Sequence, residues 1–231
     1  VQIAGAAVAR EEAAAETRVW VQDTAIRGDK VTGVELVTPA VDLIVRDSFV
    51  WTQSGSGVRC AGAAADADPK VVRNVRLRRS TVIGGRQAVD FAGSPDRPVP
   101  VEIDWRQSVS GHVRDSKQSA VARFSGWSSN QVRGALGRQL LWKSHGSKYR
   151  GQTALLAMDD AEGTAIAVDE ESWRERWQSP ASGQAGEFVR EEWPASAPKV
   201  AELIEPRLFT EPIDTKSDEG RPGAVFDAVV F

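Results

Sequence analysis

Two carboxylates and one histidine on alternating segments are the residues of this chain that could act as an acid and a base. They are Asp90, Asp104 and His112. Cleavage of a glycosidic bond needs two or three carboxylates close together on one sheet face, with an arginine or histidine beside them. No Asn-x-Asp precedes the three residues, and the Asp159-Asp160 pair follows His112. We therefore interpret both aspartates as solvated strand positions and His112 as a turn residue, with a catalytic role as the alternative.

Two arginines and one tryptophan are the candidates for ligand binding. Alternation puts Arg76 and Arg78 on the same wet face of a strand, where they could bind phosphate or a uronate; a solvated face is the other interpretation. Trp51, Trp105 and Trp142 recur near predicted strands, and exposed aromatic rings would stack on sugars. Trp105 and Trp142 share the phase of inward aliphatic residues, which favours a stack inside the core for these two.

The cysteine and the histidines give no metal or redox signal. Cys60 is the single cysteine, which excludes an internal disulfide framework, and its phase matches that of Val58, which indicates a small buried hydrophobe. The two histidines, His112 and His145, lie far apart, and three or four convergent ligands are needed to bind a metal. The sequence therefore predicts neither a metal site nor a cofactor.

A short sequence motif occurs five times. It consists of an alternating apolar run, a small polar pair, an apolar residue and a glycine or its substitute. The copies lie at residues 19–28, 43–52, 75–84, 103–111 and 140–151, and a second alternating run usually follows each. Period-two alternation indicates strands with one buried and one wet face. Repetition at this period indicates a solenoid. The sequence therefore predicts an all-β fold, a right-handed parallel β-helix of about five rungs that accepts insertions such as 63–71 and 126–139.

The two ends differ from the repeats and define three regions. Residues 1–17 are rich in alanine and glutamate, and a short capping or linker helix is expected there. Residues 18–171 form the β-helix. Residues 172–231 contain many prolines, so we expect an extended segment that packs on the solenoid, anchored by aromatic residues such as Trp173, Trp177 and Phe188.

Composition sets further limits. The chain has 231 residues, 41% of them hydrophobic, which is enough to bury a core as one domain. A net charge of −3 gives no general attraction to nucleic acid or to an anionic membrane. There is no apolar run of about eighteen residues, so this segment is not expected to cross a membrane. Because residues 3–8 are too short for a signal peptide and the first residue is Val1, we expect a segment of a longer chain.

Several rung motifs resemble a known family of β-helices. They are the D-[ST]-x-[IV]-x-G pattern at 23–28, the Pro-Val-Pro-Val-Glu-Ile run at 98–103, the Leu-Trp-Lys-Ser-His-Gly-Ser-Lys-Tyr-Arg-Gly run at 141–151 and the W-R-x-x-W turn at 173–177. The pattern resembles pectate-lyase-like C-terminal regions of bacterial multi-domain proteins, often linked to a Hanks-type serine/threonine kinase. The resemblance implies a non-catalytic, extracytoplasmic region of a larger protein, membrane-anchored through an upstream segment. Kinase signatures themselves do not occur in this sequence.

The function predicted is that of a non-catalytic interaction or spacer region, and whether the parent chain is an enzyme stays open. The expected partner is a protein or a glycan, without nucleic acid. The alternatives are a polysaccharide lyase or hydrolase that uses Asp90, Asp104 and His112, and a carbohydrate-binding module with an exposed tryptophan strip. An open last rung could stack end to end on another copy, through residues 225–231.

Overall fold

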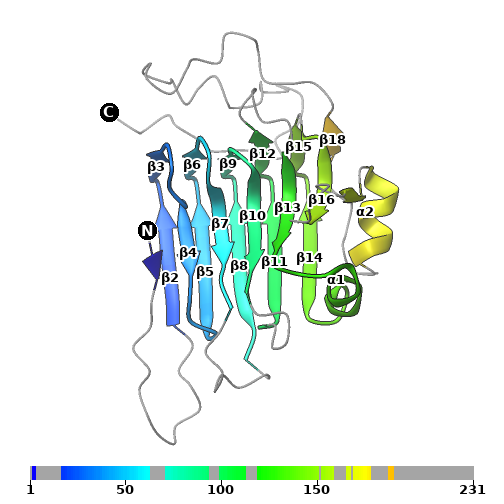
Figure 1. Cartoon of the computed structure of the whole chain (residues 1–231). Coiled ribbons are helices and arrows are strands. Elements are labelled where there is room, and N and C mark those ends of the chain that lie inside the picture. The colour runs from blue at the N-terminus through cyan, green and yellow to red at the C-terminus, as the bar shows by residue number, and fades with distance from the viewer. Residues whose placement is uncertain are drawn as a thin grey trace, which may run out of the picture.

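The structure is a computed structural model that describes residues 2–3, 17–62, 71–93, 99–112, 119–150, 152–158, 165–167, 169–177 and 187–189. Strands account for most of these residues, and two short helices occur among them. The strands lie side by side in three sheets, with both helices at the end formed by the last strands (Figure 1). The mainly β class that the alternating pattern predicts is confirmed.

Each sheet takes every third strand of the chain, except that sheet III also contains one further strand. Sheet I contains β2 (Thr17–Gln22), β5 (Val41–Arg46), β8 (Arg73–Arg78), β11 (Val101–Arg106) and β14 (Leu140–His145). Sheet II contains β3 (Ala25–Gly28), β6 (Phe49–Thr52), β9 (Thr81–Gly84), β12 (Val109–His112), β15 (Lys148–Arg150) and β18 (Glu187–Val189). Sheet III contains β1 (Gln2–Ile3), β4 (Val34–Leu36), β7 (Ser56–Cys60), β10 (Gln87–Ala92), β13 (Ala120–Ser125), β16 (Ala154–Met158) and β17 (Ala165–Ala167). The further strand is β17, which follows β16 directly in the chain; of these pairings, only that of β16 with β17 is antiparallel.

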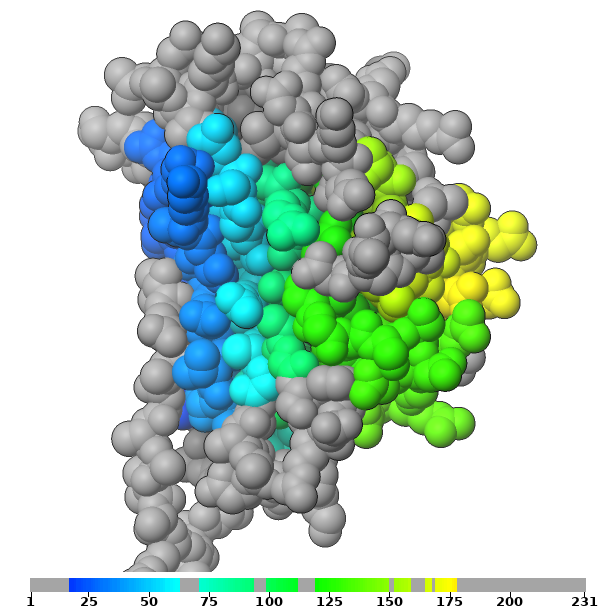
Figure 2. Space-filling model, in the orientation of Figure 1, coloured from blue at the N-terminus to red at the C-terminus, as the bar shows by residue number. Residues whose placement is uncertain are grey.

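From β2 to β16 the chain visits sheets I, II and III in turn and then returns to sheet I. Five such circuits follow one another, and each hydrogen-bonds to the circuit before and after it. On the surface they form successive bands along the body (Figure 2). This strand order is consistent with the predicted parallel β-helix of about five rungs.

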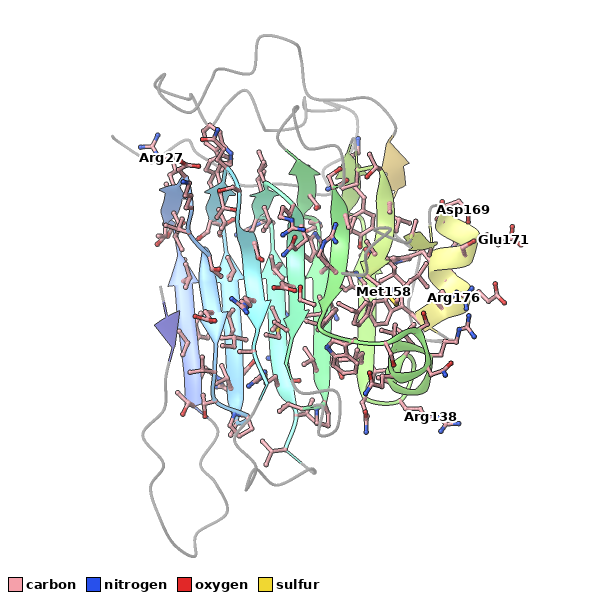
Figure 3. The ribbon with its side chains drawn as sticks, in the orientation of Figure 1. Arg27, Arg138, Met158, Asp169, Glu171 and Arg176 are labelled. Carbon is pink, nitrogen blue, oxygen red and sulfur yellow. The ribbon has the colours of Figure 1, made fainter. Side chains whose placement is uncertain are left out.

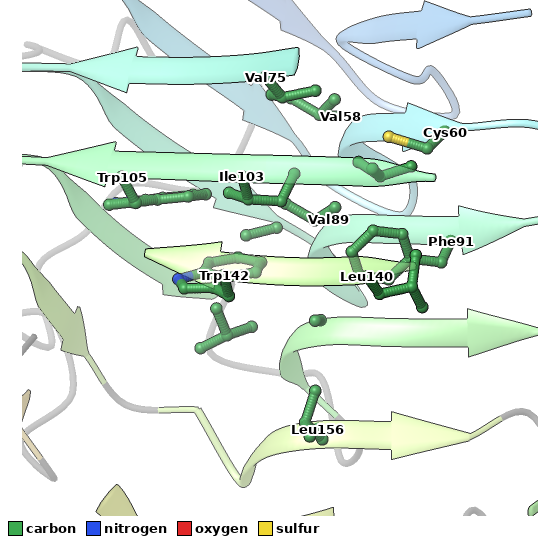
Figure 4. Close-up of a cluster of buried hydrophobic side chains, with 14 of the residues drawn as sticks. Val58, Cys60, Val75, Val89, Phe91, Ile103, Trp105, Leu140, Trp142 and Leu156 are labelled. Atoms are coloured by element: carbon green, nitrogen blue, oxygen red, sulfur yellow. The ribbon is translucent and has the colours of Figure 1, made fainter. Parts of the chain in front are cut away.

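The core lies between the sheets, and its side chains stack in columns from circuit to circuit. In sheet I, Leu43, Val75, Ile103 and Trp142 stand in register, and none is more than 1% exposed. The ring of Trp105 stacks on that of Trp142 with 5.3 Å between centroids (Figure 4). The prediction that these two tryptophans lie in the core is confirmed. Burying a large apolar side chain stabilises the fold by about 1.5–3 kcal/mol.

A single residue in the left-handed conformation makes the corner between sheets I and II in each circuit. The φ angles lie between 47° and 56° at these positions, Asp23, Asp47, Arg79, Gln107 and Gly146. This conformation costs a residue other than glycine about 1–2 kcal/mol. Only one of the five corners uses glycine, so other interactions must hold the remaining four.

A serine or threonine follows each corner residue, and we call these five residues the hydroxyl ladder. They are Thr24, Ser48, Ser80, Ser108 and Ser147. The backbone N–H of each of the first four donates to the side-chain hydroxyl of the next, with distances of 3.2, 3.3, 3.1 and 3.2 Å. The hydroxyls of Ser48, Ser80 and Ser108 donate to the carbonyl two residues earlier, at 2.7, 3.0 and 2.8 Å. The ladder thus satisfies backbone N–H groups that the turn removes from the sheets.

Helix α2 (Glu170–Trp177) packs against the last circuit and closes the core at that end. Its first turn is capped by the Asp169 carboxylate, which accepts a hydrogen bond from the Ser172 N–H at 2.7 Å. Trp173 and Trp177 are 3% and 1% exposed, and the Trp173 ring lies 5.0 Å from that of Trp142. Glu171 projects outward (Figure 3). The sequence predicted a turn for the W-R-x-x-W run; it is a helix, because the i, i+4 spacing puts both indoles on one face.

Helix α1 (Ser129–Ala135) lies within the predicted insertion at 126–139. A capping box begins it: the Ser128 hydroxyl accepts from the Gln131 N–H, and the Gln131 side chain accepts from the Ser128 N–H at 2.8 Å. Val132 and Ala135 are buried. A helix of this length draws its stability from packing rather than from propensity, so the local sequence did not predict it.

The structure describes parts of the predicted end regions. In the region 1–17, Gln2–Ile3 form β1, which pairs with β4, and Thr17 opens β2. In the region 172–231, the rest of α2 follows, and β18 pairs with β15 in parallel. The helix was predicted within 1–17; the described residues of that region are in strands, and residues 4–16 lie outside the described part of the chain, as does the self-association segment at 225–231.

Changing Ser108 to alanine should destabilise the protein by about 1–3 kcal/mol, because the buried Ser80 N–H loses its acceptor. The free energy of unfolding is measured by urea denaturation. Ser54→Ala is the matched control, since among the described residues the exposed Ser54 hydroxyl bonds only to groups of Asp29, and it should change stability by less than about 0.5 kcal/mol. Equal effects of the two changes would contradict the role given to the ladder.

Trp173→Ala should lower the free energy of unfolding by about 3–5 kcal/mol, because it opens a cavity at the end of the core. The comparison variant is Trp20→Ala, which removes an indole that is 56% exposed on the first strand of sheet I. Its effect should stay below about 1 kcal/mol. If the two variants unfold at the same urea concentration, α2 does not close the core.

Candidate functional site

The last residue of four neighbouring strands in sheet I is basic, and we call these residues the basic row. They are Arg46, Arg78, Arg106 and His145, which end β5, β8, β11 and β14. Strand pairing puts Arg46 opposite Arg78, Arg78 opposite Arg106, and Arg106 opposite His145. All four side chains are exposed. One arginine or histidine therefore stands on each of four consecutive circuits.

The basic row lines an open hollow of about 410 Å³. Arg79 and Gln107, two of the left-handed corner residues, complete the lining. Each follows directly after a member of the row, so the turn brings its side chain to the same place. Apart from His145, the hollow is lined by guanidinium groups and one amide, all of which donate hydrogen bonds.

Two carboxylates hold some of these arginines in place. Asp47 accepts from Arg46 Nε at 3.1 Å and from Arg79 Nε at 2.7 Å. Asp104 accepts from Arg106 Nε at 2.7 Å. These hydrogen bonds raise the pKa of Arg79 and that of Arg106 further above the ordinary value, so both stay cationic.

Arg78 stands in the middle of the row and makes no ion pair within the described part of the chain. Four guanidinium groups thus face two carboxylates around the hollow. The site is suited to binding anions.

The structure separates the two arginines that the sequence grouped together. Arg78 belongs to the basic row, whereas Arg76 is half-buried and pairs with Asp42 at 3.3 Å. Asp42 is fully buried and also accepts from Arg18 Nε at 3.0 Å. Arg76 therefore neutralises a buried carboxylate of the neighbouring strand, and it does not line the hollow of the basic row.

The three candidates for acid–base catalysis lie in three different sheets. Asp90, in β10 of sheet III, accepts from the Ser125 hydroxyl at 2.6 Å and lies 3.6 Å from Arg59 Nε. Asp104, in β11 of sheet I, pairs with Arg106. His112 ends β12 of sheet II opposite Gly84, and its side chain is outside the described residues. The interpretation of the two aspartates as solvated positions is wrong, because Asp90 and Asp104 are only 5% and 9% exposed and each has an arginine partner. They also do not form the pair of carboxylates on one face that glycoside cleavage needs.

Trp51 and Cys60 are buried. Trp51, in β6, is 6% exposed, so its indole does not offer an open platform for a sugar ring. Cys60, in β7, is 4% exposed and borders a small pocket with Arg73 and Phe91. Burial raises the pKa of the Cys60 thiol to about 12. The Arg73 guanidinium donates to the carbonyls of Thr38 and Ala61, which makes it a structural group.

Sequence reasoning missed Arg46, Arg106 and the grouping of His145 with them. The signal that could have found them is the triplet at the end of each first strand, which reads Arg-Asp-Ser, Arg-Arg-Ser, Arg-Gln-Ser and His-Gly-Ser at 46–48, 78–80, 106–108 and 145–147. Aligning the repeats on the serine puts the four basic residues in one column. In any single copy of the repeat, the arginine or histidine cannot be distinguished from an ordinary exposed residue at the end of a strand.

Cys60 should resist alkylation by iodoacetamide in the folded protein at pH 8, because almost none of the buried thiol is ionised at that pH. Unfolding in urea should give one modified cysteine per chain, detected by mass spectrometry. Rapid modification of the native protein would contradict the burial of this side chain.

The raised pKa also makes stability depend on pH. The unfolded thiol ionises near its ordinary pKa of 9.0, whereas the folded thiol keeps its proton up to about pH 12. The stabilising effect of the buried neutral thiol is therefore fully present below pH 9 and falls as the pH rises toward 12. Urea denaturation of the wild type relative to Cys60→Ala should show this decline above pH 9; a constant difference would contradict it.

Comparison with known proteins gives no match: no family model, no curated protein and no solved structure matches this chain. Within the described residues, neither helix has the length and apolar character needed to span a bilayer. The same residues include no cluster of three or more histidine, cysteine, aspartate or glutamate side chains arranged to hold a metal ion.

Proposed function

We propose that this chain is a closed, right-handed parallel β-helix that serves as a rigid, non-catalytic interaction domain and binds an anionic partner through the basic row. The three sheets support the solenoid, because from β2 to β16 every third strand is adjacent and parallel. Right-handedness follows from the strong preference of crossovers between parallel strands in one sheet. A hydrogen-bonded stack of circuits is stiff, because every rung is held on both sides.

The setting that we propose is a larger bacterial protein. The rung motifs resemble pectate-lyase-like regions that follow a serine/threonine kinase domain, and this resemblance supports an extracytoplasmic location beyond a membrane anchor. A rigid solenoid would there hold the face of sheet I that carries the basic row at a fixed distance from the rest of the chain. The partner would bind to the outer face of sheet I, where the basic row is exposed.

The observation that carries the proposal is the register of Arg46, Arg78, Arg106 and His145. Like charges directly opposite one another on neighbouring strands destabilise a sheet. Within the described part of the chain, Arg46 pairs with Asp47 and Arg106 with Asp104, whereas Arg78 has no carboxylate partner. A line of three arginines whose middle member has no carboxylate partner among the described residues is therefore better explained by an external anion than by the needs of the fold.

Arg78→Glu should reduce binding to dextran sulfate, because it removes the central cation and adds repulsion at the same point. We expect the wild type to be retained on an immobilised dextran sulfate column at low salt, and the variant to elute earlier, with an affinity lower by about fivefold or more.

The control is Arg138→Glu, which makes the same change in net charge. Arg138 is exposed beside α1 (Figure 3) and precedes β14, so it lies at the opposite end of sheet I from His145. It should elute close to the wild type. Equal losses in both variants would mean that net charge and not the basic row governs retention, and absence of retention of the wild type would contradict the proposed function.

A further inference from the structure

The spacing of the basic row sets a repeat that a partner must match. Neighbouring strands lie about 4.7–4.9 Å apart, so the three steps from Arg46 to His145 cover about 14 Å. The row runs across the strands, along the direction in which the circuits stack. A partner that contacts every member must present acceptors about 5 Å apart in a straight line.

Among the regular conformations of a polypeptide, the α-helix comes closest to this repeat. Side chains at i, i+3 and i+7 lie on one helix face, and an average step of 3.5 residues at about 1.5 Å per residue gives about 5.3 Å. Over three steps the mismatch with the basic row is about 1–2 Å, which long side chains absorb. Alternate residues of an extended strand are about 6.7 Å apart, so the same three steps overshoot the row by about 6 Å. A polyproline helix presents one face only every 9 Å or so.

Carboxylates are the acceptors that fit the hollow. Each guanidinium is a planar fork that can bind a carboxylate through two parallel hydrogen bonds. Arg46 and Arg106 each use Nε for an internal aspartate, which orients the fork and leaves other N–H groups to donate outward. Arg78 makes no ion pair with any described residue, and the Gln107 amide that also lines the hollow supplies a neutral donor.

We propose that the basic row binds an α-helix of a partner protein that carries Asp or Glu along one face at i, i+3 and i+7 spacing, with the helix axis parallel to the stacking direction of the circuits. This inference rests on the proposed function, because it names the kind of anion that the row receives. Each exposed ion pair changes affinity by only about two- to fivefold. Several must therefore form together, and binding weakens as salt is added.

The test uses the full chain and two synthetic peptides of identical composition, each an alanine- and glutamine-rich helix with four glutamates and a fluorescent label. The first places the glutamates on one face, at i, i+3, i+7 and i+10. The second places them at every fifth position, which distributes them around the helix. Circular dichroism confirms that the two are equally helical, and fluorescence anisotropy at low salt gives their affinities.

We expect the one-face peptide to bind at least about fivefold more tightly than the distributed peptide. Arg78→Gln should weaken its binding about two- to fivefold, and Arg138→Gln should leave it unchanged. Equal affinity for the two peptides would overturn the helical match.

The remaining outcomes separate this inference from the proposed function. If the protein binds dextran sulfate through Arg78 but not the one-face peptide, the row binds a linear polyanion, and the helix inference is wrong. If neither probe binds, the proposed function fails as well.

Discussion

The hydrogen bond from the backbone N–H of one corner to the hydroxyl of the next is the interaction on which the rest of this structure depends. At each corner between sheets I and II, a left-handed residue turns the chain, and the N–H that follows is withdrawn from both sheets. The ladder from Thr24 to Ser147 supplies its acceptor from the neighbouring circuit. Because each hydroxyl spans two circuits, it also fixes how one circuit sits on the next. A slip by one residue would break every rung of the ladder at once.

The fixed register acts on the inside and outside of the body together. Inside, it stacks Trp105 on Trp142 and keeps aliphatic residues in columns. Outside, it puts Arg46, Arg78 and Arg106 in a line, where their mutual repulsion opposes the very stacking that creates it. Asp47 and Asp104 offset part of this repulsion. Local features that oppose the fold are expected at functional sites, which is the physical reason for assigning function to this line of residues.

The sequence predicted what depends on local periodicity. Alternation indicated the strands and the inward phase of Trp142, because both follow from the two-residue period of a strand. Arg76 and Arg78 share that phase, yet only the cross-strand pairing with Asp42 shows that Arg76 is already neutralised. The separation of Asp90 from Asp104 likewise depends on which strand enters which sheet. Helix α1 was missed because its stability comes from burying Val132 and Ala135, a contact that no local pattern records.

The packing of α2 at one end of the body is a reason to assign binding to the basic row on sheet I and not to that end. In the last circuit, β18 pairs with β15, β17 pairs with β16, and Trp173 of α2 packs on Trp142 of β14. At that end sheets II and III thus terminate in β18 and β17, and α2 packs beside β14 of sheet I. A second copy that stacked there would have to displace α2 and expose two buried indoles, at a cost of several kcal/mol. The packing of α2 therefore opposes stacking on the core at this end, whereas the side chains of the basic row on sheet I are already exposed.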